Sequence, residues 1–511
     1  MIKSIQIDNF RSIQSLFIKP RNLYAFLGPN STGKTNVLKA IDLVLGEGWT
    51  TKAKVARELF NDPTNSINIE IEFTNPVMVP NNGYADTAVS SIRLEMNLYP
   101  DLTAKTTING GATFYGHEKF KKLCHFIYIP SERNLTSELR VSQWTMLGKM
   151  MRLIYENYVL HYGNNEENLK EDFKNQMNPA KEFLENDFSE TQITFKKFTD
   201  KFKEKCAENS SGLATGFHPV LDIYNINWFY KTLQIHVSED NSQLHFDSNE
   251  VGAGMQNLLM ISIFQTYSEL MGGKVIFGIE EPEIYLYPQA QRSLYKSFQK
   301  LSEHTQILYT THNPNFVNAQ RAYELEMLQK NEADGTYNFE KLDFINEIEA
   351  EKQKFKIYSH FNTERNEIFF AKKILFVEGA SDKIFYTTIF EEKWNIDIDK
   401  IGLSIIDCNG KGGIIYFGGL CSALGMNNYF AIWDSDDEAI DKYKVLSNLS
   451  EQNKGLELVP NLETFLNSKI EGANLNPNSK DKIKPAYELA ISIDVAHLPE
   501  EFNLIKQFTS E

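Results

Sequence analysis

The stretch NLYAFLGPNSTGKTNVLKAIDLVLG, residues 22–46, decides the fold of the first part of the chain. Its centre fits the pattern GxxxxGK[ST], between an apolar strand (LYAFL) and a helix (NVLKAIDLVL). Glycines in such a loop let backbone N–H groups close on phosphates, the lysine reaches the β- and γ-phosphate oxygens, and the threonine hydroxyl binds Mg²⁺. We therefore predict a site for ATP and Mg²⁺ that includes Gly28, Asn30, Gly33, Lys34 and Thr35.

A site of this kind also needs acidic groups. In VIFGIEEPEIYLYP, residues 275–288, an apolar strand ends in Glu280 and Glu281, at the edge where α/β sheets hold ligands. We expect Glu280 to hold Mg²⁺, directly or through water, and Glu281 to polarise the attacking water. The strand QILYTT, 306–311, is followed by His312, which could sense the γ-phosphate. The alternatives are a surface acidic turn and an ordinary loop histidine.

Length and composition limit the number of domains and the class of protein. The chain has 511 residues, 42% apolar and 23% charged, which predicts two or three folded domains. Its four cysteines form no CxxC pair, so neither a zinc site nor a disulfide framework has support. The first residues lack the apolar run of a secretory signal, and we expect a cytoplasmic protein with no membrane partner. The net charge of −16 argues against binding nucleic acid by overall basicity, although a local basic channel stays compatible with it.

Residues 1–330 resemble the ABC-type ATPases of the SMC and DNA-repair class. The resemblance includes the opening IKSIQIDNFRS, which in that class precedes the nucleotide loop at about this spacing. Such proteins carry a glycine-rich signature that contacts the γ-phosphate held by a partner subunit. Gly252 and Gly254 of EVGAGMQ, 250–256, lie in the matching place without the usual serine, the alternative being an ordinary helix start. The resemblance implies a homodimer or higher homo-oligomer.

The C-terminal part is strongly acidic. Residues 371–511 hold 14 lysines, no arginine and 22 acidic residues, a net charge of −8. Apolar strands there end in Glu378, with Asp382 four residues later, and in Asp434 and Asp436, while a third runs into Asp407 and glycines. Two-metal phosphodiester chemistry needs clustered carboxylates on a rigid frame. Each piece alone also fits a solvated turn or a helix-capping acid.

In this order the acidic strand ends resemble the TOPRIM domain of topoisomerases, primases and related nucleases. An ABC head followed by TOPRIM resembles the OLD (overcoming lysogenisation defect) family of nucleases over essentially the whole chain. That resemblance adds Glu463 of NLETFL as a metal ligand and Lys484 of KIKPAYELA as a residue that stabilises the transition state. The implied metal ligands are Glu378, Asp382, Asp434, Asp436 and Glu463, and Glu378 is also counted as catalytic.

We thus expect an α/β protein: an ABC-type P-loop ATPase head with a helical dimerisation insertion, followed by a Rossmann-like TOPRIM domain. The insertion is predicted from apolar residues at helical spacing between 141 and 208. The expected boundaries are 1–140 and 213–345 for the head, 141–212 for the insertion, 346–370 for a linker and 371–511 for TOPRIM.

The expected activity is that of an ATP-binding and ATP-hydrolysing, divalent-metal-dependent DNA endonuclease. Its expected cofactors are ATP with one Mg²⁺, and two Mg²⁺ or Mn²⁺ ions in TOPRIM. The family resemblance implies a role in antiphage defence, with a helicase or a retron reverse transcriptase with its DNA as a separate partner. The alternatives are a non-cleaving ATP-dependent DNA clamp or scaffold, and a topoisomerase-like or primase-like use of TOPRIM. The same coupling allows ATP either to activate or to inhibit cleavage, and the sequence leaves both open.

Overall fold

The computed structural model describes the following residues: 1–46, 48, 50–80, 85–114, 117–132, 139–142, 145–185, 194–209, 224, 233–238, 246–271, 275–331, 335–338, 365–435, 454–479 and 481–510. They form two units, Met1–Ser131 with Gly273–Glu511, and Glu132–Gly272. The second unit is broader than the predicted insertion, because it includes the helix that carries Gly252 and Gly254 near its start. Among the described helices, none is both long and apolar enough to cross a membrane.

The first unit contains a twelve-stranded sheet with an antiparallel half and a parallel half. In the antiparallel half, buried side chains alternate with partly exposed ones from Ile5 to Asp8 of β1 (Ile2–Phe10), as in a half-buried strand. In sheet order its strands are β7 (Ala112–Thr113), β6 (Thr103–Ile108), β5 (Thr87–Asn97), β4 (Ile67–Val79), β1 (Ile2–Phe10), β2 (Ile13–Ile18) and β14 (Gly335–Asn338).

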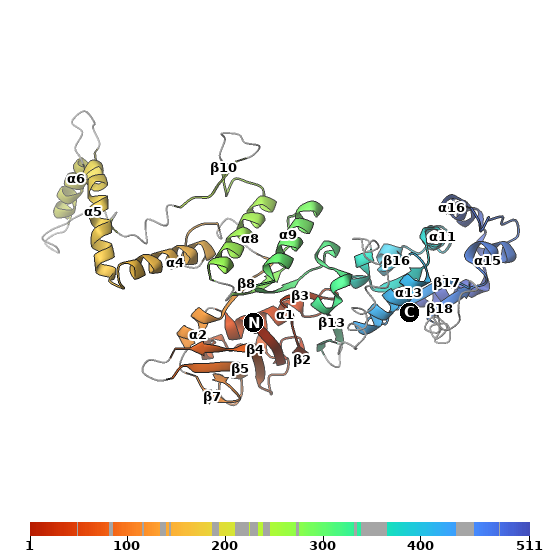
Figure 1. Ribbon diagram of the computed structural model, residues 1–511, viewed down its shortest axis with the longest axis horizontal. Helices are drawn as coiled ribbons and strands as arrows, with labels where there is room; N and C mark the ends of the chain where they lie inside the picture. Colours follow the sequence, from red (N-terminus) through yellow and green to blue (C-terminus); the bar gives the residue numbers. More distant parts are fainter. Residues whose placement is uncertain are drawn as a thin grey trace. The chain divides into compact units, whose positions relative to one another are not determined.

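The parallel half continues from β14 and holds the predicted nucleotide motifs (Figure 1). Its order is β13 (Leu325–Asn331), β3 (Leu23–Leu27), β12 (Gln306–Thr310), β11 (Val275–Glu280) and β8 (His125–Ile129). Every residue of β3, β11 and β12 is buried, as expected for parallel strands covered on both faces. The helical segments that lie between the strands of this twelve-stranded sheet in the chain are α1 (Lys34–Leu45), η1 (Lys52–Lys54), η2 (Arg57–Leu59), α2 (His117–Leu123), α9 (Pro288–Leu301), η4 (Pro314–Phe316) and η5 (Ala319–Glu324).

A second, four-stranded parallel sheet lies in the C-terminal part, in the order β16 (Leu403–Asp407), β15 (Lys373–Val377), β17 (Tyr429–Asp434) and β18 (Gly455–Leu458). The chain runs from β15 outward to β16 and then returns to the other side of β15 to form β17. The order in which strands are added across the sheet therefore reverses between β15 and β17, although all four strands are parallel. Open α/β sheets bind ligands at such a reversal point. The surrounding helical segments are η7 (Arg365–Phe369), α11 (Ala380–Thr388), η8 (Ile389–Lys393), α12 (Ile398–Ile401), α13 (Lys411–Ala423), α15 (Leu462–Lys469), α16 (Ile483–Ser492), η9 (Val495–His497), η10 (Glu500–Phe502) and α17 (Asn503–Ser510).

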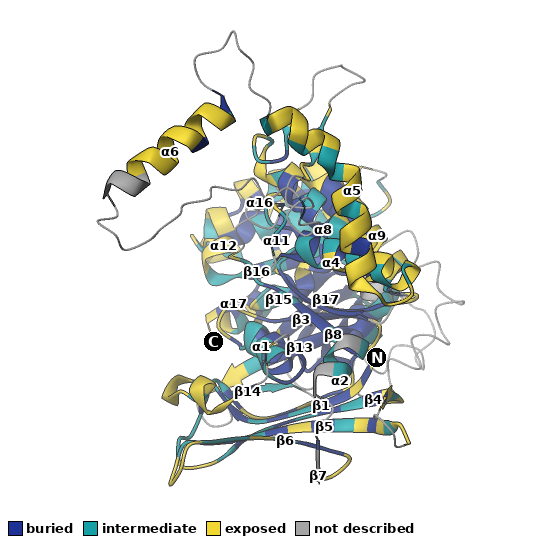
Figure 2. Ribbon diagram, turned by 90° about the vertical axis from the view of Figure 1, so that its left-hand side faces the viewer, coloured by how far each residue is buried: buried dark blue, intermediate teal, exposed yellow. Residues whose placement is uncertain are grey.

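The second unit consists mainly of helices: α4 (Met146–His161), α5 (Glu166–Glu185), α6 (Phe195–Asn209) and α8 (Ala253–Leu270), with the short strands β9 (His236–Val237) and β10 (Phe246–Asp247). The Thr145 hydroxyl oxygen accepts a hydrogen bond from the backbone N–H of Gly148 and so caps α4. Figure 2 shows α6 exposed along most of its length. The predicted α/β fold with a helical insertion is confirmed, whereas the dimerisation role stays a prediction.

Candidate nucleotide site and candidate metal centre

The loop between β3 and α1 requires glycine at two positions. Gly28 has φ +134°, and a Cβ there would lie 2.2 Å from the carbonyl oxygen of Leu328. Gly33 has φ +94°, and its Cβ would lie 2.5 Å from the hydroxyl oxygen of Thr336. Backbone conformation and packing therefore already account for both glycines. Asn30 is exposed in the same loop.

Lys34 is the residue of this loop that is poised for a ligand. Its Nζ donates to the carbonyl oxygens of Gly28 at 3.0 Å and Pro29 at 2.9 Å, inside the loop. Burial lowers the pKa of Lys34 to about 8, against the opposing effect of the Glu281 carboxylate. Among the described residues, the hydrogen-bond acceptors of this buried ammonium group are backbone carbonyls, which makes it a strong candidate for a phosphate contact. Thr35 follows it in the first turn of α1.

Glu280 and Glu281 lie where β11 ends, but they are held differently. The Glu280 carboxylate accepts from the Tyr128 hydroxyl at 2.5 Å and from the backbone N–H and hydroxyl of Ser131 at 3.2 and 3.1 Å. Glu281 has φ +42°, an unusual conformation for a residue with a side chain. Its backbone N–H donates to the carbonyl oxygen of Thr310 at 3.0 Å, at the end of β12.

His312 completes this group at the end of β12. Burial and the Lys34 cation lower the pKa of His312, and the Glu281 carboxylate opposes them. The imidazole is therefore neutral near pH 7, with one ring nitrogen able to donate and the other able to accept. Thus residues from the ends of β3, β11 and β12 come together at one sheet edge, as the motif spacing predicted.

Glu283, which was not among the residues predicted from the sequence, holds the His312 backbone. Its Oε1 accepts from the Thr311 hydroxyl at 2.6 Å and from the backbone N–H of His312 at 3.1 Å. Burial raises the pKa of Glu283 to about 7, although these hydrogen bonds act in the opposite direction. A third acid after the Glu280–Glu281 pair was the available signal, but its partners become visible only once β11 and β12 are paired.

The predicted signature lies at the start of α8, in the second unit. Gly252 precedes the helix with φ −60° and ψ 152°, values open to any residue. No described atom lies within 4 Å of a Cβ built on Gly252. Neither the backbone conformation nor packing against the described residues therefore requires that glycine, which is compatible with close approach of another molecule. Gly254 follows in the first turn of the helix.

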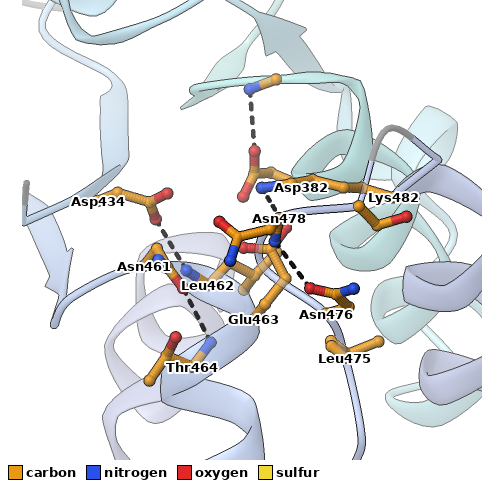
Figure 3. Close-up of polar contacts among 12 residues, drawn as sticks. Asp382, Asp434, Asn461, Leu462, Glu463, Thr464, Leu475, Asn476, Asn478 and Lys482 are labelled. Carbon is orange, nitrogen blue, oxygen red and sulfur yellow. Dashed lines mark hydrogen bonds and ion pairs between the residues drawn. The ribbon is translucent and has the colours of Figure 1, made fainter.

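Glu378 and Asp434 meet at the reversal point of the C-terminal sheet. Glu378 follows β15, and Asp434 ends the neighbouring strand β17. The backbone N–H of Asp434 donates to Glu378 Oε1 at 2.8 Å. The backbone N–H of Leu462 donates to Asp434 Oδ1 at 2.9 Å (Figure 3). The start of α15 thus fixes the orientation of the Asp434 carboxylate.

Two further carboxylates add negative charge to this place. Asp382 accepts from the backbone N–H of Gly379 at 2.9 Å, and Glu463 is buried in the first turn of α15. Burial raises the pKa of Asp434 to about 8 and of Asp382 to about 7. The charges of Glu378 and Glu463 add to both shifts, and the charge of Asp382 adds to the shift of Asp434. Carboxylates that repel one another in a buried place suit a divalent cation.

The structure does not bring all predicted ligands together. Asp436 lies outside the described residues. Within the described part of the chain, no three acidic, histidine or cysteine side chains are already arranged to hold a metal ion. Glu463 is instead paired with Lys482, whose Nζ lies 2.9 Å from Glu463 Oε1. A cation at this centre would have to replace or share that contact.

The lysine that contacts a carboxylate of this centre is Lys482, whereas the family resemblance implies Lys484. Lys482 directly precedes α16. Lys484, in the first turn of that helix, has a side chain 73% exposed and lies 3.7 Å from Glu488, one turn further on. In this structure the Lys484 side chain is therefore largely solvated and lies beside Glu488.

This difference gives a prediction. We expect Lys482→Ala to lower metal-dependent DNA cleavage by about 10²-fold, since one cationic group near developing negative charge contributes on that order. Lys484→Ala should change it by less than about 3-fold, as expected for a solvated lysine. Initial rates of plasmid nicking measure both. A large loss in Lys484→Ala with little change in Lys482→Ala would contradict the placement.

The carboxylate cluster also predicts a gain in stability on losing charge. The pKa of Asp434 in the folded chain lies above its unfolded value of about 3.9. The folded state then binds more protons, and stability falls as pH rises from about 4 to 8. We expect Asp434→Asn to raise the metal-free Tm at pH 8 by about 2 °C, because asparagine still accepts from Leu462 N–H. Differential scanning calorimetry in EDTA checks this, with the exposed Asp399→Asn as control; a lower Tm in Asp434→Asn alone would mean that the charge stabilises the fold.

The fold and the two residue groups define a P-loop ATPase head joined to a TOPRIM domain. The family model described as AAA ATPase domain matches residues 1–96 and 86–317. The model described as "Overcoming lysogenization defect protein-like, TOPRIM domain" matches residues 369–436. The chain belongs to the overcoming lysogenization defect (OLD) family of ATPase–TOPRIM proteins.

Known relatives cover most of the chain. The OLD nuclease of Thermus scotoductus is 26% identical over 98% of this chain and 97% of the relative. The Old nuclease of Escherichia phage P2 is 20% identical over 83% of this chain and 75% of the relative. Among solved structures, the Smc head domain from Pyrococcus furiosus aligns with 69% of this chain and with 99% of its own length. The sequence identity is 15% and the TM-score is 0.42. That score is too low to define the fold, which rests on the strand order.

Proposed function

We propose that the chain is an ATP-binding and ATP-hydrolysing, divalent-metal-dependent DNA endonuclease that nicks or cleaves DNA by two-metal hydrolysis. The observation that carries this proposal is the pairing of Glu378 and Asp434 at the reversal point between β15 and β17. The names of the relatives support it, because the Thermus scotoductus protein is an OLD nuclease and two Bacillus cereus relatives carry the name Endonuclease GajA.

At the TOPRIM centre, Glu378, Asp382, Asp434 and Glu463 would hold the cations, together with Asp436. Bound there, the cations supply an activated water and stabilise the leaving oxygen. The chain's own groups orient this set: Leu462 N–H fixes Asp434, and Asp434 N–H fixes Glu378. Lys482 places positive charge beside Glu463, where it would stabilise the negative charge that a phosphodiester gains in the transition state.

At the head, Gly28, Asn30 and Gly33 would surround the phosphates and Lys34 would leave its carbonyl partners for the phosphate oxygens. Thr35 and Glu280 would hold the Mg²⁺ that accompanies ATP. Glu281 would polarise the attacking water, and His312 would contact the γ-phosphate. Gly252 and Gly254 would contact the γ-phosphate held by a second copy, so hydrolysis would need at least a dimer.

Exposed apolar side chains on the insertion support its role in dimerisation. Phe198 and Phe202 of α6 stack at 5.8 Å, and their exposures are 53% and 45%. Large exposed apolar residues on neighbouring helices are Tyr158, Leu160, Phe183 and Leu184. Such side chains are typical of an interaction surface. Light scattering of a Phe198→Asp, Phe202→Asp double variant should show loss of the dimer, with Lys201→Asp on the same helix as control; an unchanged mass would refute this role.

The cytoplasmic location, the role in antiphage defence and a separate helicase or retron partner are proposals that rest on the family resemblance. The activity itself is tested by incubating supercoiled plasmid with Mg²⁺ or Mn²⁺, with and without ATP. We expect metal-dependent nicked or linear product and ATP turnover. Turnover without cleavage would favour the clamp, and relaxed closed circles would favour a topoisomerase-like activity.

A further inference from the structure

One short segment, η7, contacts both the nucleotide side and the metal side of the first unit. It is a single helical turn just before β15, and it contains Arg365 and Asn366 as its first two residues. Asn366 is 8% exposed, and the Arg365 side chain is 12% exposed. Neither residue belongs to the predicted ATP or metal ligands.

Toward the ATPase head, Asn366 holds the turn that follows His312. Its Nδ2 donates to the carbonyl oxygens of Pro314 and Val317, both at 2.9 Å. Pro314 is the first residue of η4 and Val317 directly follows it, and η4 begins two residues after His312. The Oδ1 atom of Asn366 is buried and has no hydrogen-bond partner among the described residues. The amide nitrogen, with its two donors, is therefore the part of this side chain that makes contacts.

The loop between His312 and η4 is itself tightly held. Glu283 accepts from the backbone N–H of His312. The side-chain amides of Asn313 and Asn315 both donate to Gln291 Oε1, at 3.0 and 2.9 Å. A shift of His312 on contact with a γ-phosphate would therefore move η4 with it, because the loop between them is short and is fixed by these hydrogen bonds.

Toward the metal side, Arg365 holds the end of β16. Its Nε donates to the carbonyl oxygen of Asp407 at 2.8 Å, and its guanidinium lies 3.8 Å from the Asp407 carboxylate. Asp407 pairs in register with Val377, the residue before Glu378. The backbone N–H of Gly410 donates to the carbonyl oxygen of Glu378 at 2.7 Å. The β16 end and the loop after it thus contact the backbone of a predicted metal ligand.

We propose that Asn366 and Arg365 are positioning residues that couple the γ-phosphate contact at His312 to the placement of Glu378. The coupling runs from η4 to Asn366, along the backbone to Arg365, and on to Asp407 and Glu378. The steps between elements are hydrogen bonds, an ion pair and a strand pairing. This inference rests on the proposed ATP-dependent nuclease function. It predicts that ATP changes the cleavage rate by biasing two arrangements of this segment.

The measurement is the ratio of plasmid cleavage rates with and without ATP at saturating Mg²⁺. We expect the wild-type ratio to differ from 1 by about 5-fold or more, in either direction. Asn366→Ala and Arg365→Ala should bring the ratio to within about 2-fold of 1. ATP turnover and cleavage without ATP should stay within about 3-fold of wild type, and Arg365→Lys should recover part of the ratio because it keeps the charge.

The matched control is Gln329→Ala, which removes a different contact between the head and the C-terminal domain, from Gln329 Nε2 to the carbonyl oxygen of Gly425 at 3.2 Å. It should leave the ratio unchanged. An unchanged ratio in both η7 variants, an equal collapse in Gln329→Ala, or a wild-type ratio of 1 would overturn the inference. A wild type that neither cleaves nor turns over ATP would instead overturn the proposed function itself.

A second measurement needs no variant. Hydrogen exchange of the wild-type chain, with and without a non-hydrolysable ATP analogue, reports the mobility of η7 and of residues 403–410. We expect exchange at both segments to change when the analogue binds. A change confined to residues 28–35 would contradict the coupling.

Discussion

Asp434→Asn is expected to reduce metal-dependent DNA cleavage on the order of 10³-fold or more, since it removes one charged group from the proposed ligands of a two-cation centre. The substitution keeps the side-chain shape and the acceptor for Leu462 N–H. The loss should therefore come with an intact fold and normal ATP turnover. Single-turnover nicking of supercoiled plasmid at saturating Mn²⁺ measures the effect.

Asp399→Asn is the matched control for this loss. Asp399 is an exposed acid on α12 in the same domain, and its substitution should leave cleavage within about 2-fold of wild type, as expected for a solvated surface charge. Cleavage by Asp434→Asn within about 5-fold of wild type would remove this residue from the reaction and would count against a metal centre at the end of β17.

Glu281→Gln is expected to lower the rate of ATP hydrolysis by about 10²–10³-fold, because a group that polarises the attacking water contributes on that order. The change is isosteric, and the contact with Thr310 is made by the backbone N–H of Glu281, so the unusual φ is retained. ATP binding should stay within about 3-fold of wild type. Lys34→Ala, in contrast, should lose binding as well, because the phosphates lose their cation.

Nucleotide binding by calorimetry and phosphate release together separate these two variants. Glu303→Gln, in the turn after α9, is the exposed control and should behave as wild type. Hydrolysis by Glu281→Gln close to the wild-type rate would assign the water-polarising role to another residue. The neighbouring Glu283 would then be the next candidate, because its pKa of about 7 is suited to proton transfer.

The sequence predicted those features that depend on residues close together in the chain. The P-loop pattern needs eight consecutive residues, and an apolar run that ends in an acid marks a strand end at Glu280, Glu378 and Asp434. The order of such units also carried the family resemblance, and the α/β fold and the family are both confirmed. The roles of the individual site residues stay predictions.

The features that escaped prediction depend on which elements lie side by side. The choice between Lys482 and Lys484 turns on where α16 begins, and two residues of difference reverse the direction of a side chain near a helix start. The hydrogen-bond partners of Glu283 follow β12, so its role becomes visible only when β11 and β12 are paired. Asn366 contacts carbonyls about 50 positions earlier in the chain, which no local pattern signals.

The most direct test of the account is the anomalous scattering of Mn²⁺ in crystals of the chain grown with that ion. We predict manganese peaks at the C-terminal sheet edge, bound by carboxylates among Glu378, Asp382, Asp434 and Glu463, with Lys482 moved from Glu463 Oε1. Manganese found only at the nucleotide loop beside Thr35, with the TOPRIM carboxylates unliganded, would contradict the account.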